Sequence, residues 1–466
     1  MKVVETDYLI VGSGAVGMAF ADTLIDETDA HLTIIDRHAK PGGHWNDAYS
    51  FVALHQPSGF YGVNSAALGS NRRDAAGINE GLYELATGSE VSAYYETLMR
   101  QRFLPTGRIS YHPMTEYVGD GRFVSLLSGS ETEVHVRRKT VDATYGSPTV
   151  PATHRRRFEV ADDVRIMPPN DLPRLWTLKE RRPTRLVVIG AGKTAMDVMT
   201  WLLNVGAEPD SIQWIKPRDS WLLNRICFQP GFEFFDEVFG AQAAQMRAFA
   251  EATSVPDIFD RLEAARVVMR VDQDVTPTMF HFATISAQEV NELRRIRNVI
   301  RKGHVRSIRG DRIEFDAGDE RGEEGALYID CTASAVEPRS LRPIFQGDLI
   351  VPQLVRAAQA TFSAALIAYI EAHCQDDHTK NRLCQPVPFP ANLADYPSTN
   401  IVNMLNQYRW SQDKKLMDWI NKSRLDGFGR MIAVGHQDSS KSALINVLHE
   451  LWKPALQNLK ILSGSA

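Results

Sequence analysis

The sequence contains the same local pattern twice: a short apolar run, a glycine-rich turn, and then residues with helical spacing. The first copy is DYLIVGSGAVGMAFADTLID at residues 7–26, and the second is RLVVIGAGKTAMDVMTWLL at residues 185–203. Each apolar run is rich in β-branched residues, which is typical of a buried parallel strand. A parallel strand followed by a helix is half of a βαβ unit. The pattern therefore predicts an α/β fold with two Rossmann-like sheets.

The first turn has the glycine spacing that a dinucleotide pyrophosphate requires. Gly12 permits the tight turn out of the strand, Gly14 lets a phosphate approach the backbone, and Gly17 lets the helix pack closely on the sheet. The start of a helix also presents free N–H groups to a phosphate. The next apolar segment, at 30–36, ends in Asp36, which can accept hydrogen bonds from ribose hydroxyls. We therefore predict dinucleotide binding at this turn.

The second turn repeats this arrangement with one change. Gly190 and Gly192 form the turn, and Ala195 replaces the third glycine while still permitting close packing of helix and sheet. Lys193 and Thr194 stand at the start of the helix. Both are candidates for further phosphate contacts.

The strand after the second turn ends in cations instead of an acid. SIQWI at 211–215 is followed by Lys216 and Arg218. Cations at this position favour the 2′-phosphate of NADP over the free 2′-hydroxyl of NAD. A solvated basic loop is the alternative reading. The location favours NADPH at the second site.

The residues after the first acid indicate which dinucleotide binds there. The segment DRHAKPGGHW, at 36–45, resembles the acid–GGxW segment of flavin-containing and Baeyer–Villiger monooxygenases. The resemblance implies FAD at the first site, with Arg37, Gly43, His44 and Trp45 among its contacts. The strand GALYIDCTAS, at 325–334, resembles the late strand that closes the FAD site in these flavoproteins. It implies FAD-site roles for Asp330 and Thr332.

The same resemblance implies how the chain is divided. The NADP-binding domain is inserted in the FAD-binding domain. We expect a first FAD-binding part at 1–165, an NADP-binding domain with a helical cap at 166–322, and a second FAD-binding part with C-terminal helices at 323–466. The segment 145–176 is rich in proline, which disfavours helix and central strand, so it is interpreted as the first crossing between domains.

The implied reaction is that of an NADPH-dependent monooxygenase. NADPH reduces FAD, reduced FAD captures O₂ as a C4a-hydroperoxide, and a small-molecule substrate is oxygenated. These families place an asparagine after GGxW, and here Asn64 stands in GVNS, with His55 in the same loop. Both are candidate catalytic residues. Asn64 also fits an ordinary turn beside Gly62, and His55 also fits a turn cap.

Two other functions stay open at this point. The fingerprint FxGxxxHxxxY/F of the narrow subfamily is represented only by His154 and Phe158. An FAD-dependent NADPH oxidoreductase that passes electrons to another acceptor without oxygen insertion is therefore the alternative. A non-catalytic FAD protein is a weaker third reading. No CxxxxC follows the first turn, which argues against the disulfide reductases.

The composition of the chain limits the classes of binding partner that can be expected. The 466 residues include 52 Lys and Arg against 57 Asp and Glu, a formal net charge of −5, which gives no reason to expect nucleic acid or an anionic membrane. The four cysteines form no CxxC, so we predict no metal site and a cytoplasmic, reducing environment. The apolar segment 360–372 is too short to span a bilayer and is predicted to be a buried helix. The sequence leaves open whether the protein forms a homodimer.

Overall fold

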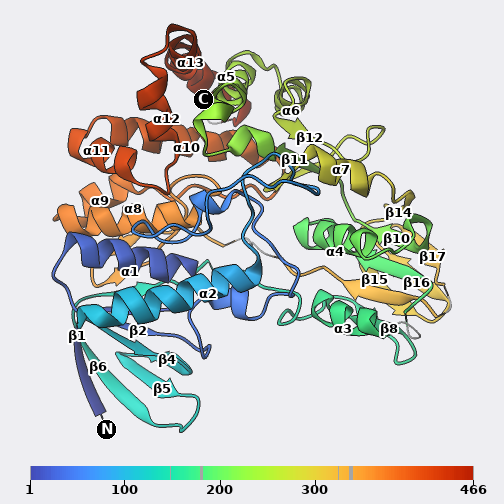
Figure 1. The fold of residues 1–466 in the computed structure, drawn as a ribbon, viewed down its shortest axis with the longest axis horizontal. Helices are drawn as coiled ribbons and strands as arrows, with labels where there is room; N and C mark the ends of the chain where they lie inside the picture. Colours follow the sequence, from blue (N-terminus) through green and yellow to red (C-terminus); the bar gives the residue numbers. More distant parts are fainter. Residues whose placement is uncertain (1, 147, 179–181, 324, 335–338, 465–466) are drawn as a thin grey trace.

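A large, mostly parallel sheet contains strands from residues 2–142 and from residues 345–350, and Figure 1 labels its strands β1, β2, β4, β5 and β6. The computed structural model describes residues 2–146, 148–178, 182–323, 325–334 and 339–464. The strands of this sheet are β1 (Lys2–Val11), β2 (Leu32–Ile35), β3 (Ile109–His112), β4 (Thr115–Gly119), β5 (Arg122–Ser125), β6 (Glu131–Asp142), β19 (Phe345–Gln346) and β20 (Leu349–Ile350). They run in the order β19-β20-β6-β1-β2-β3, with the β4–β5 hairpin joined to β6. Because β20 pairs with β6, the chain returns late to its first sheet.

Four helices accompany this sheet: α1 (Ala15–Glu27), α2 (Gly88–Leu98), α8 (Ala360–His373) and α9 (Asp377–Leu383). α1 packs against α8, and both contribute to one hydrophobic core with β1 and β2. α8 is apolar on nearly every side and almost fully buried, as expected for a helix enclosed on all faces. The prediction of a buried helix over 360–372 is confirmed. We call this sheet and its helices the first unit.

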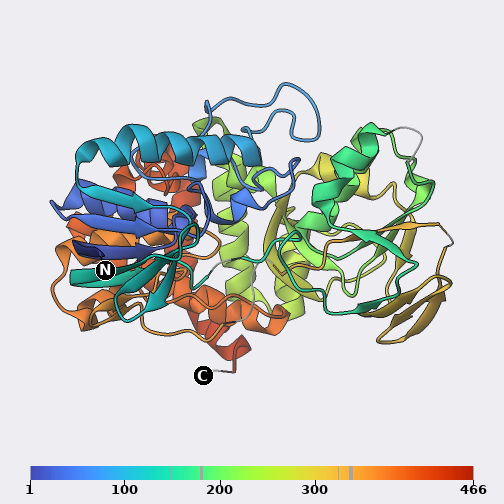
Figure 2. The same ribbon diagram turned by 90° about the horizontal axis from the view of Figure 1, so that it is seen from below.

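A second sheet carries the second glycine turn. Its strands are β8 (Arg165–Met167), β9 (Leu186–Ile189), β10 (Ile212–Ile215), β14 (Asn298–Ile300) and β18 (Leu327–Asp330). They pair in parallel in the order β14-β10-β9-β18-β8. The accompanying helices are α3 (Leu172–Thr177), α4 (Lys193–Asn204) and α7 (Ala287–Leu293). This second unit lies beside the first (Figure 2). The predicted fold class, with one Rossmann-like unit inserted in another, is confirmed.

Two smaller sheets are attached to the second unit. One contains β11 (Ser220–Asn224), β12 (Val268–Met269) and β13 (Met279–Ile285), and the other contains β7 (Glu159–Val160), β15 (Val305–Arg309), β16 (Arg312–Phe315) and β17 (Gly318–Arg321).

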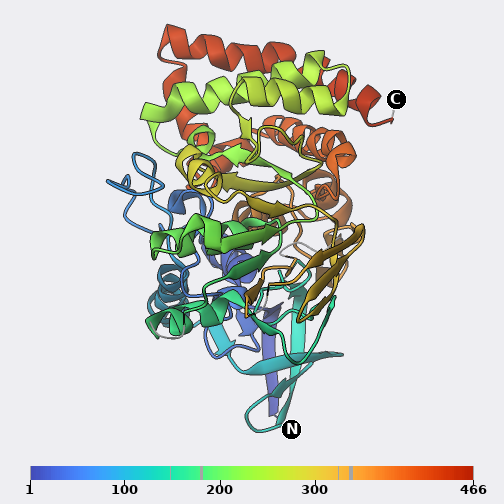
Figure 3. The same ribbon diagram turned by 90° about the vertical axis from the view of Figure 1, so that its right-hand side faces the viewer.

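Helices form the far end of the molecule, away from the N-terminus (Figure 3). They are α5 (Phe235–Glu251), α6 (Val255–Ala264), α10 (Tyr396–Ser411), α11 (Lys414–Lys422), α12 (Phe428–Gly435) and α13 (Ser439–Leu462). α5 and α13 pack side by side. Helices are present, as expected, within 166–322 (α5 and α6) and near the C-terminus (α10 to α13). Among the described helices, none is both long and apolar enough to cross a bilayer.

Strand pairing corrects one expectation about where the chain crosses between units. β7 already pairs with β15, and β18 pairs with β8 and β9. Both strands, β7 and β18, had been expected to lie in the FAD-binding parts, at 1–165 and 323–466. The segment 325–334, which was expected to close the FAD site, therefore belongs to the second sheet. Its parallel pairing with β9 instead places the end of β18 beside the second glycine turn.

Candidate functional site

The first glycine turn leaves the start of α1 open to a ligand. Gly12 has φ +99°, and a Cβ at Gly17 would lie 2.0 Å from the carbonyl oxygen of Gly12, so only glycine fits at both positions. Gly14 is the N-cap of α1 and supplies no side-chain cap. By contrast, Thr87 and Ser286 cap α2 and α7 with their side chains. The first N–H groups of α1 have no partner within the helix, which is the arrangement that binds a phosphate.

The GGxW segment lies directly on this turn. The N–H of Gly42 donates to the carbonyl oxygen of Ser13 at 2.9 Å. Gly43 has φ +57°, and a Cβ there would lie 2.9 Å from the Cα of Gly14. Because backbone touches backbone with no side chain between them, both segments present main-chain groups to the same place. The predicted proximity of Gly43 to the first turn is present in the structure.

His44 and Trp45 follow in a short 3₁₀ turn, η1 (Gly43–Asn46). Burial lowers the pKa of His44 to about 4, so its imidazole is neutral at pH 7. The Trp45 indole N–H donates to the Tyr61 hydroxyl at 2.8 Å, which fixes the indole edge-on to the Tyr61 ring. Both residues remain candidate FAD contacts.

Asp36 was predicted to accept hydrogen bonds from a ribose, but in the structure its carboxylate is hydrogen-bonded to the protein. Its Oδ2 accepts hydrogen bonds from the N–H of Ser13 at 2.6 Å and from the Ser13 hydroxyl at 2.8 Å. Its Oδ1 accepts from the N–H of His38 at 2.8 Å and lies 2.9 Å from Nδ1 of the same residue. The residue is only 6% exposed. Both carboxylate oxygens of Asp36 thus already accept hydrogen bonds from the protein. The predicted hydrogen bond from a ribose hydroxyl to Asp36 therefore has no free acceptor in this arrangement.

His38 is a residue that the sequence analysis missed. Its Nε2 lies 2.8 Å from Asp47, so the imidazole bridges two carboxylates. The hydrogen bond to Asp36, followed by that to Asp47, raises the pKa of His38. Its position two residues after Asp36 was the available signal. Arg37, between them, is exposed and forms no ion pair among the described residues.

The second glycine turn is also uncapped. Gly192 is the N-cap of α4 without a side-chain cap, and a Cβ there would meet no atom of the described residues within 4 Å. Gly190 has φ +139°, and a Cβ there would lie 2.6 Å from the carbonyl oxygen of Cys331. The end of β18 therefore packs on this turn. Thr332 and Asp330 bond to each other there, with the Thr332 hydroxyl donating to Asp330 at 2.7 Å.

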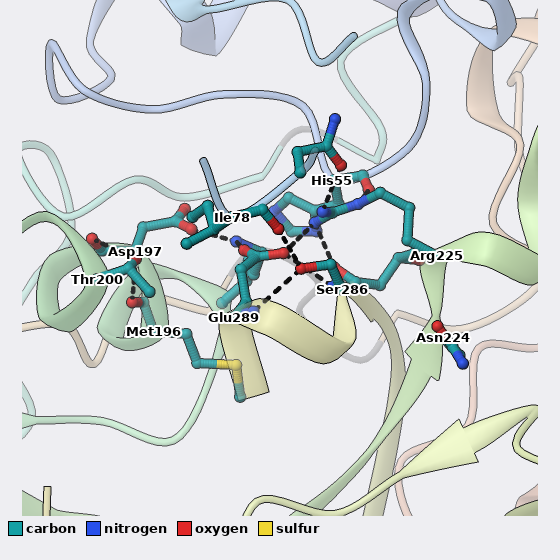
Figure 4. Close-up of polar contacts among 12 residues, drawn as sticks. His55, Ile78, Met196, Asp197, Thr200, Asn224, Arg225, Ser286 and Glu289 are labelled. Carbon is teal, nitrogen blue, oxygen red and sulfur yellow. Dashed lines mark hydrogen bonds and ion pairs between the residues drawn. The ribbon is translucent and has the colours of Figure 1, made fainter. Parts of the chain in front are cut away.

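Lys193 is directed away from its predicted phosphate contact. Its ammonium group is paired with Asp197, one turn along α4, and lies 3.3 Å from Oε1 of Glu289 (Figure 4). Its side chain is only 10% exposed. The candidate phosphate-binding groups that remain at this turn are the N–H groups of α4 and the Thr194 hydroxyl.

Lys216 and Arg218, the two cations after β10, differ in burial and in their ion-pair partners. The Lys216 ammonium is buried and lies 2.5 Å from Asp219, and burial lowers the pKa of Lys216. Arg301 also bonds to Asp219, at 2.7 Å. Lys216 is thus a structural ion-pair partner, contrary to its predicted role. Arg218 is exposed, forms no ion pair among the described residues, and remains the candidate contact for a 2′-phosphate.

The two candidate catalytic residues lie in different surroundings. Burial, followed by the charges of Lys193 and Arg225, lowers the pKa of His55 to about 3, so His55 is neutral. Asn64 accepts a hydrogen bond at Oδ1 from the Ser423 hydroxyl at 2.8 Å. His55 therefore faces the second unit, whereas Asn64 is held by a C-terminal segment.

Arg424 strengthens that C-terminal contact. It donates to the carbonyl oxygens of Val63 at 2.8 Å and Gly59 at 2.7 Å, and also to that of Tyr61. One guanidinium thus satisfies the backbone of the loop that carries Asn64. Sequence reasoning missed this residue, since nothing near Arg424 in the chain indicates its partners.

Comparison with known proteins agrees with this geometry. Residues 10–67, which contain the first turn and the GGxW segment, match the NAD(P)-binding Rossmann-like domain family. Two relatives, uncharacterized protein Rv2000 of Mycobacterium tuberculosis and uncharacterized protein Mb2023 of Mycobacterium bovis, are each 47% identical over 425 residues. Each alignment covers 91% of this chain and 78% of the relative. The chain belongs to this mycobacterial protein family.

The fold of the family is also found in a solved flavoenzyme structure. Cyclohexanone-bound cyclohexanone monooxygenase, in its rotated conformation, aligns with a TM-score of 0.50 at 12% identity. The alignment covers 79% of this chain and 88% of the monooxygenase. It extends the resemblance found in the GGxW segment to the two-unit architecture of the family.

Proposed function

We propose that this protein is an NADPH-dependent flavoprotein monooxygenase that acts on a small molecule. The observation that carries the proposal is the pair of uncapped glycine turns, at Gly14 and Gly192, each at the start of a helix after a parallel strand. Two such turns in one chain provide places for two dinucleotides. FAD, when bound, would supply a hydride acceptor and, once reduced, a centre that reacts with O₂.

The residues at the first turn fit a flavin dinucleotide at its phosphates. The N–H groups of α1 and the Gly14–Gly43 contact would hold the pyrophosphate, and Trp45 would lie beside the bound group. Arg37 would serve the adenosine end, because Asp36 is already engaged by Ser13 and His38.

The second turn fits NADPH. The N–H groups of α4 and the Thr194 hydroxyl would hold the pyrophosphate, and Arg218 would pair with the 2′-phosphate. This assignment, with the pairing of β7 and β18, supports a division in which residues 159–330 form the NADP-binding part and the segments on either side form the FAD-binding part.

The candidate catalytic residues would work through neutral hydrogen bonds. His55 has a pKa of about 3, so at pH 7 its imidazole donates through one nitrogen and accepts through the other. The Asn64 side chain uses Oδ1 to accept from Ser423, which leaves its NH₂ group to donate to a reacting oxygen. Neither residue is placed to act as a charged acid.

The test begins with purified protein reconstituted with FAD. We expect one bound FAD per chain, reduction by NADPH without oxygen, and much less hydrogen peroxide than NADPH consumed when air and substrate candidates are added. Gly14→Val places a branched side chain against Gly43 and should abolish FAD binding, which provides the control. Peroxide equal to NADPH under all conditions would favour the alternative, an FAD-dependent NADPH oxidoreductase. A protein that cannot take up FAD would refute both.

A further inference from the structure

A chain of buried charges joins the second glycine turn to the first unit. It runs from Arg225 to Glu289, from Glu289 to Lys193, and from Lys193 to Asp197, with alternating sign (Figure 4). The Arg225 guanidinium lies 2.6 Å from Glu289, and its Nε donates to the carbonyl oxygen of His55 at 2.8 Å. The chain of charges thus begins and ends beside residues of the first unit.

The bridging loop, residues 47–56, receives both ends of this chain. The Tyr49 hydroxyl donates to Asp197 Oδ2 at 2.7 Å. Phe51 stacks on Trp201, one turn further along α4, with ring centroids 4.8 Å apart. The loop follows the GGxW segment and leads to Asn64, so the element that would contact the flavin is attached directly to the helix that would bind NADPH.

Burial makes this attachment rigid. Arg225 is fully buried, and the side chains of Glu289 and Lys193 are 5% and 10% exposed. Burial alone would raise the pKa of Glu289, but the charges of Lys193 and Arg225 outweigh it and lower that pKa to about 2. Removing one partner would leave an uncompensated buried charge, which is strongly destabilising. The loop and α4 therefore hold one arrangement.

We propose that Tyr49, acting through Asp197 and the charges behind it, is a positioning residue that fixes the distance between the flavin and nicotinamide sites. This inference rests on the proposed function. When both dinucleotides are bound, they would supply a hydride transfer in which the C4–H bond of NADPH breaks and an N–H bond on the flavin forms, so that two electrons and one proton pass together and NADP⁺ is the product. The reacting atoms must approach to roughly 3–3.5 Å, and a displacement of about 1 Å can cost on the order of a hundredfold in rate.

Tyr49→Phe tests the role of the hydroxyl alone. The ring that packs on Phe51 is kept, with centroids 4.7 Å apart in the wild type, and the hydroxyl is lost together with its hydrogen bonds to Asp197 and Thr194. In anaerobic stopped-flow experiments we expect flavin reduction by NADPH to slow by roughly tenfold or more. The isotope effect with NADPH deuterated at the transferred position should increase, while FAD content stays at the wild-type value.

A second measurement uses the protein without either cofactor. Hydrogen–deuterium exchange over residues 47–56 should be faster in Tyr49→Phe than in the wild type. Tyr328→Phe is the matched control, because the Tyr328 hydroxyl is buried in β18 and has no hydrogen-bond partner among the described residues. That variant should match the wild type in reduction rate, isotope effect and exchange.

Three results would overturn the positioning role of Tyr49. Unchanged reduction rate and isotope effect in Tyr49→Phe would overturn the positioning role while leaving the proposed function intact. Equal slowing in Tyr328→Phe would overturn it as well, since the loss would not depend on Asp197. A wild-type protein that binds FAD but is not reduced by NADPH would overturn the proposed function first, and the positioning role with it.

Discussion

Single residues at the first turn show how tightly the backbone is used. Gly17 and Gly12 are in contact across the turn, and Gly43 touches Gly14, so a methyl group at several of these positions has no space. Gly192 differs, since the space around it is open. Tight packing and open space therefore both occur among the turn glycines: Gly17 and Gly190 pack against backbone, whereas a Cβ at Gly192 would meet no described atom within 4 Å.

This difference predicts that alanine at position 17 mainly lowers stability, whereas alanine at position 192 mainly weakens NADPH binding. Gly17→Ala places a Cβ 2.0 Å from the Gly12 carbonyl oxygen and should cost about 3 kcal/mol of unfolding free energy. Gly192→Ala meets no atom and has φ −87°, so its stability should stay within about 0.5 kcal/mol of the wild type. Its Kd for NADPH should nevertheless rise roughly tenfold, since about 1.4 kcal/mol of contact is lost. Urea unfolding and NADPH titration measure the two effects. Equal destabilisation by both would contradict the geometry.

His38 gives a prediction about pH. Its pKa is raised in the folded protein by Asp36 and Asp47, so its stabilising contribution is complete below the unfolded value of 6.5 and is lost as pH rises through the folded value. His38→Gln should therefore lower the unfolding free energy by about 1–2 kcal/mol at pH 6 and by less at pH 9. Urea unfolding of both proteins across this range is the measurement. A difference that grows with pH would show that the imidazolium is not the stabilising form.

The glycine turns were predictable because their constraints are local, whereas the partners of the charged residues were not. Lys193 was expected to face a phosphate, but Glu289, 96 positions along the chain, lies beside it. Lys216 was expected to bind NADP, but Asp219 and Arg301 pair around it instead. A side chain's partner depends on tertiary packing, which a single sequence does not state.

At the scale of elements, two cations follow β10: one lies in a buried ion pair, and the other is exposed to solvent. Lys216 is buried against Asp219, and Arg218 lies in solvent. The position after this strand is where the 2′ group of the adenosine ribose is read in such sheets. The cofactor preference is therefore expected to depend on Arg218 alone.

Arg218→Ala should raise KM for NADPH by roughly tenfold and leave that for NADH nearly unchanged, because a charge-assisted contact to the extra phosphate is lost. Steady-state kinetics with both coenzymes provide the measurement. Lys216→Met is the comparison: it should lower the melting temperature while keeping the NADPH-to-NADH ratio. A ratio that changes only in Lys216→Met would reverse these assignments.

At the scale of the whole molecule, the C-terminal segment completes the first unit. Arg424 donates to three carbonyl oxygens of the 59–63 loop, and Ser423 donates to Asn64. The two-unit plan was predictable from the repeated turns. The closure by residues 423–424 was not, because it joins segments that are 359 to 365 positions apart in the chain.

Arg424→Gln should leave several of these carbonyl groups without a donor and cost about 3 kcal/mol of unfolding free energy. Loosening of the loop should also expose residues 59–64 to protease. Differential scanning calorimetry and limited proteolysis with mass spectrometry provide the measurements. Wild-type stability together with an unchanged cleavage pattern would show that the clamp is dispensable.

The late return of the chain to its first sheet has a consequence for synthesis on the ribosome. β1, β2 and β6 emerge early, but β20, which pairs with β6, and α8, which packs on α1, are translated only after the whole second unit. Until then the edge of β6 and the apolar side of α1 lack their native cover. Exposed strand edges and apolar helix faces favour aggregation in nascent chains. We therefore expect this protein to depend on chaperones during translation more than a chain whose first unit is contiguous in sequence.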